Sequence, residues 1–269
     1  MERYQIILAY DGTDFLGFQR QENNSRTVQL VVENALRALN WQGSTIYAAG
    51  RTDTGVHASG QVIAVDLDWL HSPEKLAKAL NAHLPHDVAV REVHLAAPDF
   101  HPRYYARRRS YCYRMCNDPF PDPLRERYMW RVEKPLDAAA MQAAANELLG
   151  FYDCSAFGTP PHKGGSTMRK IYRAEWLYRD PSIYEFHVTA NAFLYHMVRR
   201  MVFLLAAVGK GALRCAEFVS GVRESQPLPA GLAPAKGLAL TEVDYHSAWD
   251  EELASKTVKV DGIVDIEEF

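Results

Sequence analysis

The sequence is poor in the residue patterns from which metal centres, disulfide frameworks and cofactor sites are built. Its ten histidines form no HExxH or other paired-ligand motif, so no zinc site is expected. A P-loop and a GxGxxG motif are also missing. The four cysteines show no CxxC spacing, and we expect them to be reduced packing residues: Cys112, Cys116, Cys154 and Cys215.

Long apolar segments are missing as well. No apolar run is long enough to span a bilayer, and Met1 is followed by neither an apolar nor an arginine-rich leader. We therefore expect a cytoplasmic protein that does not associate with membranes. With 269 residues, 48% of them hydrophobic, the chain can bury a large core in one domain or in two closely joined halves.

An overall positive charge is absent, but charge is distributed unevenly along the chain. The formal net charge is −3, whereas the segment Glu242–Phe269 alone has nine acidic residues and two lysines, a net of −7. Residues 1–241 therefore carry the remaining +4. Two windows, 101–114 and 162–173, contain basic residues and no acidic residue.

The basic windows combine positive charge with tyrosines. The first has four tyrosines among its five arginines, which are Arg103, Arg107, Arg108, Arg109 and Arg114. Clustered arginines beside aromatic rings suit a nucleic acid, whose phosphates bind cations and whose bases stack. A solvated basic face is the alternative. We favour an RNA ligand because both acid-free basic windows contain tyrosine.

The first half of the chain has a regular order of predicted elements. Alternating residues predict strands, and an apolar stripe at helical spacing predicts helices. Ser72 and Pro73 are typical of a helix start. The predicted order is β-α-β-β-α-β, with a strand at 4–10, a helix at 27–40, strands at 45–48 and 62–65, a helix from 72 and a strand at 88–95.

The second half repeats this order. It predicts a strand at 110–116, a helix capped by Asp137, a hairpin at 171–178 and 183–190, a helix at 192–208 and a strand at 238–244. Two such units predict an α+β fold of two ferredoxin-like βαββαβ halves with helices on one side of each sheet. The predicted divisions are 1–105, 106–247 and an acidic C-terminal tail at 248–269. A mobile, cationic substrate loop is predicted within the long connection 151–170.

The segment 49–61 has the composition of a functional loop. Gly50 and Gly55 bracket Asp53, with Arg51 two residues before it and His57 four residues after it. Glycine allows backbone conformations that other residues resist, and loops of fixed geometry often carry binding residues. A surface hairpin whose polar side chains only satisfy turn backbone is the alternative.

Several motifs together resemble one family. They are GRTDTGVHASGQV from Gly50, YDGT with GFQRQ from Tyr10, RSYCY from Arg109, SAF from Ser155, FLYHMVR from Phe193 and APAKGL from Ala233. In their order along the chain, these motifs are similar to those of the bacterial tRNA pseudouridine synthases of the TruA type. The resemblance implies a pseudouridine synthase fold whose sheets join around a central RNA-binding cleft. It also implies a homodimer that isomerises uridine to pseudouridine at tRNA positions 38, 39 and 40, in the anticodon stem-loop, without a cofactor.

The predicted helix 192–208 is apolar nearly all round, yet it contains Arg199 and Arg200. A buried guanidinium is costly unless it meets a carboxylate. We expect such a partner for Arg199, and the resemblance makes that partner Asp53. Arg200 can instead extend to solvent along its stem. The family usually has asparagine at this position, so no role is carried over to Arg200.

The resemblance also implies roles for the site residues. Asp53 is the nucleophile, ionised at neutral pH and oriented by Arg199, although covalent attack at C1′ and assisted elimination both remain open. Tyr111 packs on the target base, and its hydroxyl is a candidate for proton transfer at C5. A strand tyrosine with only a packing role is the alternative. Contacts to the RNA are expected from Arg51, Arg20, Arg107, Arg108 and Arg109.

Two other classes of protein share features with this sequence. Asp11-Gly12-Thr13 after a strand resembles the end of the haloacid-dehalogenase motif, but Ala9 stands where that motif needs its nucleophilic aspartate. A non-catalytic pair of RRM modules would explain two ferredoxin-like units. The aromatic, glycine-rich RNP signature is missing, however, and a binder has no obvious use for Asp53.

Overall fold

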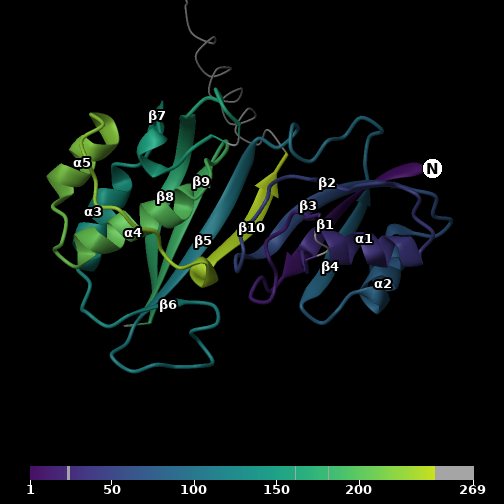
Figure 1. Cartoon of the computed structure of the whole chain (residues 1–269), viewed down its shortest axis with the longest axis horizontal. Helices are drawn as coiled ribbons and strands as arrows, with labels where there is room; N and C mark the ends of the chain where they lie inside the picture. The colour runs from purple at the N-terminus through teal and green to yellow at the C-terminus, as the bar shows by residue number, and fades with distance from the viewer. Residues whose placement is uncertain (23–24, 161, 181, 246–269) are drawn as a thin grey trace, which may run out of the picture.

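The computed structural model describes residues 1–22, 25–160, 162–180 and 182–245, which form an α+β fold built on one mixed sheet (Figure 1). The strand order is β4-β1-β3-β10-β5-β9-β8-β7, with β2 paired to β3 and β6 paired to β5. The predicted α+β class is confirmed. The predicted acidic tail, 248–269, lies outside the described residues.

The first half follows the predicted order. Its elements are β1 (Glu2–Tyr10), α1 (Val28–Ala38), β2 (Tyr47–Ala48), β3 (His57–Leu67), α2 (Pro73–His83) and β4 (Val88–Leu95). Thr27 caps α1 by accepting a hydrogen bond from the Leu30 amide. Ser72 stands at the predicted cap position of α2 but makes no capping hydrogen bond with its side chain.

The second half contains the predicted elements and several more. They are β5 (Arg108–Asn117), β6 (Trp130–Val132), α3 (Ala138–Asn146), β7 (Gly150–Asp153), β8 (Met168–Asp180), β9 (Ile183–Ala190), α4 (Met197–Gly209), α5 (Cys215–Arg223) and β10 (Leu238–Asp244). Asp137 caps α3 as predicted. The helix predicted from residue 192 begins only at Met197. Part of the connection predicted as a structureless loop forms β7 and a 3-10 turn at Ser155–Phe157.

The two halves meet at β10. This strand pairs in parallel with β3, at Ala239 with His57, and antiparallel with β5. A Cβ at Gly60 of β3 would lie 2.2 Å from the Thr241 carbonyl oxygen, so the close approach of these two strands needs glycine. The C-terminal strand therefore lies against the strand that follows the Asp53 motif. The division at residue 105 stays a prediction.

One face of the sheet carries the core. Along β1, Tyr4, Ile6, Leu8 and Tyr10 are buried and the alternate residues are half-buried, and β9 shows the same alternation. In Figure 1, α1 and α2 lie with the strands of the first half and α3, α4 and α5 with those of the second. Helix α4 is buried on most sides, as its composition predicted. Among the described helices, none has the length and apolarity to cross a bilayer.

Candidate active site

A cavity of about 1330 Å³ opens between the connection after β1, the segment 49–56 and the start of α4. We call residues 49–56 the Asp53 loop. Thr52 anchors it, since its hydroxyl lies 2.8 Å from the Tyr10 hydroxyl and its carbonyl accepts from the Phe18 amide at 3.0 Å. Gly55 turns the chain with φ +76°, a conformation that favours glycine, as expected. The anchored loop presents Asp53 to the cavity.

Asp53 meets Arg199 in this cavity. Arg199 Nη1 lies 3.1 Å from Asp53 Oδ2, and Arg199 Nε donates to the Ala233 carbonyl at 2.9 Å. The guanidinium is therefore held from two sides. The Asp53 side chain is 24% exposed, so a ligand can still reach its carboxylate. The contact expected for Arg199 is present, while the roles of both residues stay predictions.

His196 is a third member of this group, and sequence reasoning gave it no role. It precedes α4 in the left-handed conformation, with φ +65°. Its Nε2 lies 3.5 Å from Asp53 Oδ2, and its ring stacks on Tyr195 at 3.6 Å between centroids. The apolar pattern at helical spacing continues through position 196, so the sequence predicts a helical residue there. In the structure the helix begins one residue later, at Met197.

Tyr111 lines the same cavity from β5. Its ring contacts the edge of Phe193 at 4.9 Å between centroids. Burial raises the pKa of Tyr111 to about 12, so its hydroxyl stays protonated at neutral pH. The side chain can therefore offer a ring face and a hydroxyl donor to a ligand, but it is a poor base.

The cavity wall is strongly positive. Six arginines line it, and among the described residues only one carboxylate does, that of Asp53. The arginines are Arg20, Arg51, Arg103, Arg109, Arg169 and Arg199. Arg51 and Arg103 are exposed. Arg20 is paired with the buried carboxylate of Glu33, which reduces the charge it offers to a ligand.

The three consecutive arginines of the first basic window are not equivalent. Arg109 is buried, and its guanidinium donates hydrogen bonds to the backbone carbonyls of Ala49, Arg103 and Asn191. These hydrogen bonds hold the Asp53 loop to β5, which gives Arg109 a structural task, and its expected RNA contact stays a prediction. Arg107 is exposed, and the Arg108 guanidinium lies 4.5 Å from the Tyr172 ring centroid. Neither of these two lines the cavity.

Arg169 was not singled out from the sequence. It is buried and donates to the carbonyls of Ser166 and Met168, while its Nε has no hydrogen-bond partner. No acidic side chain is paired with it among the described residues. A buried guanidinium without a carboxylate partner favours an anionic ligand.

Comparison with known proteins decides the family. A sequence profile described as tRNA pseudouridine synthase matches residues 6–105 and 144–246. The tRNA pseudouridine synthase A of Methylobacterium nodulans is 41% identical over 250 residues, covering 92% of this chain and 98% of its own. That of Limosilactobacillus fermentum is 38% identical over 253 residues, covering 92% and 97%. The chain belongs to the tRNA pseudouridine synthase family.

A weaker likeness exists among solved structures. A chain in the crystal structure of the archaeal box H/ACA sRNP Nop10–Cbf5 complex aligns with this protein at a TM-score of 0.36 and 13% sequence identity. The alignment covers 76% of this chain and 43% of that chain. Within this member of the tRNA pseudouridine synthase family, Asp53 and Arg199 lie inside the matched ranges, and Tyr111 lies between them. Family membership sets aside the haloacid-dehalogenase and the RRM alternatives.

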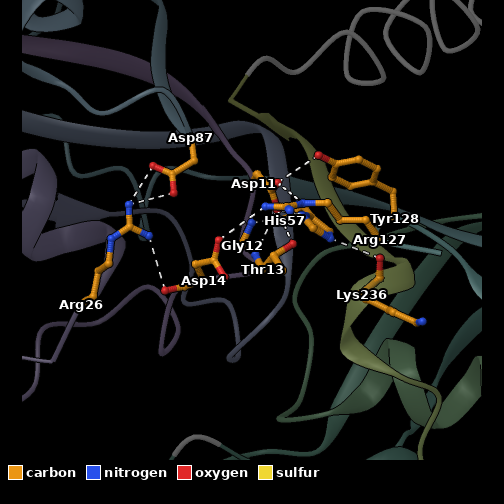
Figure 2. A network of polar contacts seen from close by, with 10 residues as sticks. All are labelled: Asp11, Gly12, Thr13, Asp14, Arg26, His57, Asp87, Arg127, Tyr128 and Lys236. Atoms are coloured by element: carbon orange, nitrogen blue, oxygen red, sulfur yellow. Dashed lines mark hydrogen bonds and ion pairs between the residues drawn. The ribbon is translucent and has the colours of Figure 1, made fainter. Parts of the chain in front are cut away.

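In this synthase-family chain, a polar network supports the far end of the Asp53 loop (Figure 2). His57 accepts a hydrogen bond at Nδ1 from the Gly12 amide at 3.0 Å, so its proton is on Nε2, which donates to the Lys236 carbonyl at 3.2 Å. Burial lowers the pKa of His57, against the opposing effect of the Asp11 carboxylate. A Cβ at Gly12 would lie 2.0 Å from the Val56 carbonyl oxygen, so only glycine fits beside the loop.

Asp11 joins this support to the second half of the chain. Its carboxylate accepts from Arg127 Nε at 2.8 Å and from the Tyr128 hydroxyl at 3.0 Å, and both come from the connection between β5 and β6 (Figure 2). Burial alone would raise the pKa of Asp11, but hydrogen bonds from Thr13, Arg127 and Tyr128 outweigh it and hold the pKa well below its ordinary value. Both halves of the chain therefore brace the Asp53 loop.

Among the described residues, one group that could offer metal ligands lies outside the cavity. Cys112, Glu185 and His187 offer ligand atoms within 4.8 Å of one another. Burial raises the pKa of the Cys112 thiol to about 11, and both Glu185 oxygens already accept from arginines, Arg114 and Arg179. A protonated thiol and a carboxylate paired with two guanidinium groups make a poor cation site.

Proposed function

We propose that this protein isomerises uridine to pseudouridine in the anticodon stem-loop of tRNA, at positions 38, 39 and 40. The observation that carries the proposal is the Asp53 carboxylate, held by Arg199 in a cavity lined by six arginines. A lone accessible carboxylate in a strongly cationic cavity suits a reaction on a polyanion that needs one nucleophile or base.

The reaction makes simple demands on the site. The bond between N1 and C1′ breaks, the uracil turns while bound, a bond forms between C5 and C1′, and a proton leaves C5 while another is gained at N1. No electron or external group is transferred, so Asp53 needs no redox or phosphoryl partner. Asp53 acts on the ribose side, either by attack at C1′ or by assisting elimination.

The surrounding residues then have distinct tasks. Arg199 aims the Asp53 carboxylate, because its guanidinium is itself fixed by the Ala233 carbonyl. The Tyr111 ring holds the extruded uracil by stacking, and its protonated hydroxyl donates to the base. Arg51 and Arg20 contact the phosphates beside the target, and Arg107 and Arg108 contact RNA further from it.

One experiment tests the whole proposal. The purified protein is incubated with a prefolded, unmodified tRNA transcript in excess EDTA, and pseudouridine is located by chemical mapping. Modification at positions 38–40 is expected without any added cofactor. A matched transcript with cytidine at those three positions is the control. Modification elsewhere would contradict the substrate, and dependence on a protein-bound ion would contradict the mechanism.

We also propose that the protein works in the cytoplasm as a homodimer, as the resemblance of its motifs implies. Light scattering during size-exclusion chromatography, with and without tRNA, measures the mass of the particle. A mass of one chain at micromolar concentration in both conditions would contradict the homodimer.

A further inference from the structure

An exposed aromatic ring stands at the mouth of the cavity. Tyr104, on the connection between β4 and β5, is 76% exposed and lines the same cavity as Asp53. His101 and Tyr47 line the cavity beside it. An isolated exposed aromatic needs no explanation, but three rings gathered at the edge of a cationic cavity are a surface that a ligand can use.

The three rings form a short ladder. The centroids of His101 and Tyr104 are 4.3 Å apart with an angle of 35° between the ring planes, and those of Tyr47 and His101 are 5.1 Å apart. The Arg103 amide donates to His101 Nδ1 at 3.2 Å, which fixes the orientation of the middle ring. Tyr104 is the outermost and by far the most exposed of the three.

The segment that carries Tyr104 is fixed from beneath. Arg109 donates to the Arg103 carbonyl at 2.9 Å, and the Tyr245 hydroxyl donates to the Pro102 carbonyl at 2.9 Å. The neighbouring Phe100 is buried and packs on Tyr245. The fold therefore holds the Tyr104 ring in place without burying it. Because the ring is already ordered, binding a flat ligand on it loses little conformational entropy.

We propose that Tyr104 is a stacking platform for the nucleobase next to the target uridine. The inference rests on the proposed function and adds a second base-binding position to it. Bases stack on exposed aromatic rings with little regard to sequence, and the exposed side chains of Arg103 and Arg51 line the cavity near the intervening phosphate.

The platform imposes a requirement on the RNA. A base can lie on Tyr104 only if it leaves the stack of its own helix, which is cheapest where a stem meets a loop. The platform would therefore favour uridines at a stem-loop junction over uridines enclosed by base pairs on both sides. Sequence around the target would matter much less, because every base has a stacking face.

Two RNA hairpins test this requirement, one with the uridine at the stem-loop junction and one with it inside the stem. Tyr104→Ala should lower kcat/KM on the junction hairpin about tenfold, the usual effect of removing one stacking ring. Tyr104→Phe should retain the parent value. Phe120→Ala is the matched control, because Phe120 is also 76% exposed but does not line the cavity. Equal rates for Tyr104→Ala and Phe120→Ala would overturn the platform.

Photocrosslinking separates this inference from the proposed function. A hairpin with 5-iodouridine beside the target is bound to the full chain and irradiated, and the crosslinked residue is identified by mass spectrometry. Crosslinking at Tyr104 is expected. Crosslinking there with no pseudouridine formed would support the platform and refute the isomerase, whereas pseudouridine formation with crosslinks only elsewhere would refute the platform alone. Failure of the hairpin to bind would refute both.

Discussion

Arg199 Nη1 lies 3.1 Å from Asp53 Oδ2, although the two residues are 146 positions apart in the chain. The contact joins a loop of the first half to the first turn of α4 in the second. Since Arg199 also donates to the Ala233 carbonyl, three separate segments meet at one guanidinium. The carboxylate is accessible only because these segments surround it without covering it.

The first prediction concerns Asp53. Asp53→Asn keeps the shape of the side chain but removes its charge, so pseudouridine formation should fall to background. Binding of tRNA should change little, because affinity comes mainly from many phosphate contacts. Turnover and filter-binding affinity are measured on the same transcript. Substantial turnover by Asp53→Asn would contradict the role of the carboxylate.

The second prediction compares two adjacent arginines. Arg199→Lys should lose most activity, because an ammonium cannot reach both Asp53 and the Ala233 carbonyl as the planar guanidinium does. Arg200→Lys should be mild, since Arg200 donates to the carbonyls of Pro229 and Gly231, away from Asp53. Single-turnover rates at saturating tRNA measure the difference. Similar losses at both positions would mean that the contact with Asp53 does not set the rate.

The third prediction is a pH dependence of stability. The pKa of His57 is lowered from 6.5 in the folded protein, so the unfolded chain binds more protons below about pH 6.5. The free energy of unfolding should therefore fall as the pH drops from 7.5 through 6.5 towards the lower pKa of the folded state. Protonation of Nδ1 would also break the hydrogen bond from the Gly12 amide.

Urea denaturation of the parent and of His57→Gln at pH 7.5 and pH 5.5 measures this effect. The variant should be less stable at pH 7.5 but should lose less stability on acidification. His86→Gln, at an exposed position, is the control and should follow the parent. An unchanged pH dependence in His57→Gln would assign the loss to other groups.

Local pattern was enough to predict much of the fold. The alternation in β1 and the cap at Asp137 gave elements close to their observed bounds, because these signals depend on neighbouring residues. The short strands β6 and β7 exist only through their pairing with β5 and β8. No signal within three or four residues can report such pairing, and both strands were missed.

The candidate site was predicted unevenly for a similar reason. Asp53 and Arg199 stood out because a carboxylate in a glycine-rich loop and an arginine in an apolar helix both break their local pattern. The burial of Arg109 could have been predicted from the strand. Side chains at every second position of a strand point to the same face, and Arg109 shares its face with the buried Tyr111, Tyr113 and Met115. The position of His196 depends on one left-handed residue before α4, which periodicity does not reveal.

The last prediction separates RNA-binding arginines from structural ones. Arg109→Gln should destabilise the fold by about 2 kcal/mol or more, because it leaves buried backbone carbonyls without donors. The double variant Arg51→Gln with Arg103→Gln should fold normally, since both side chains are exposed. It should weaken tRNA binding and flatten its salt dependence, by about 0.7–0.9 in log–log slope for each phosphate that the protein no longer neutralises. Arg91→Gln, exposed on β4 and away from the cavity, is the control for a simple loss of positive charge. Affinity is measured from low to physiological salt for all variants and for the parent. A double variant with the slope of the parent would place the RNA on another surface.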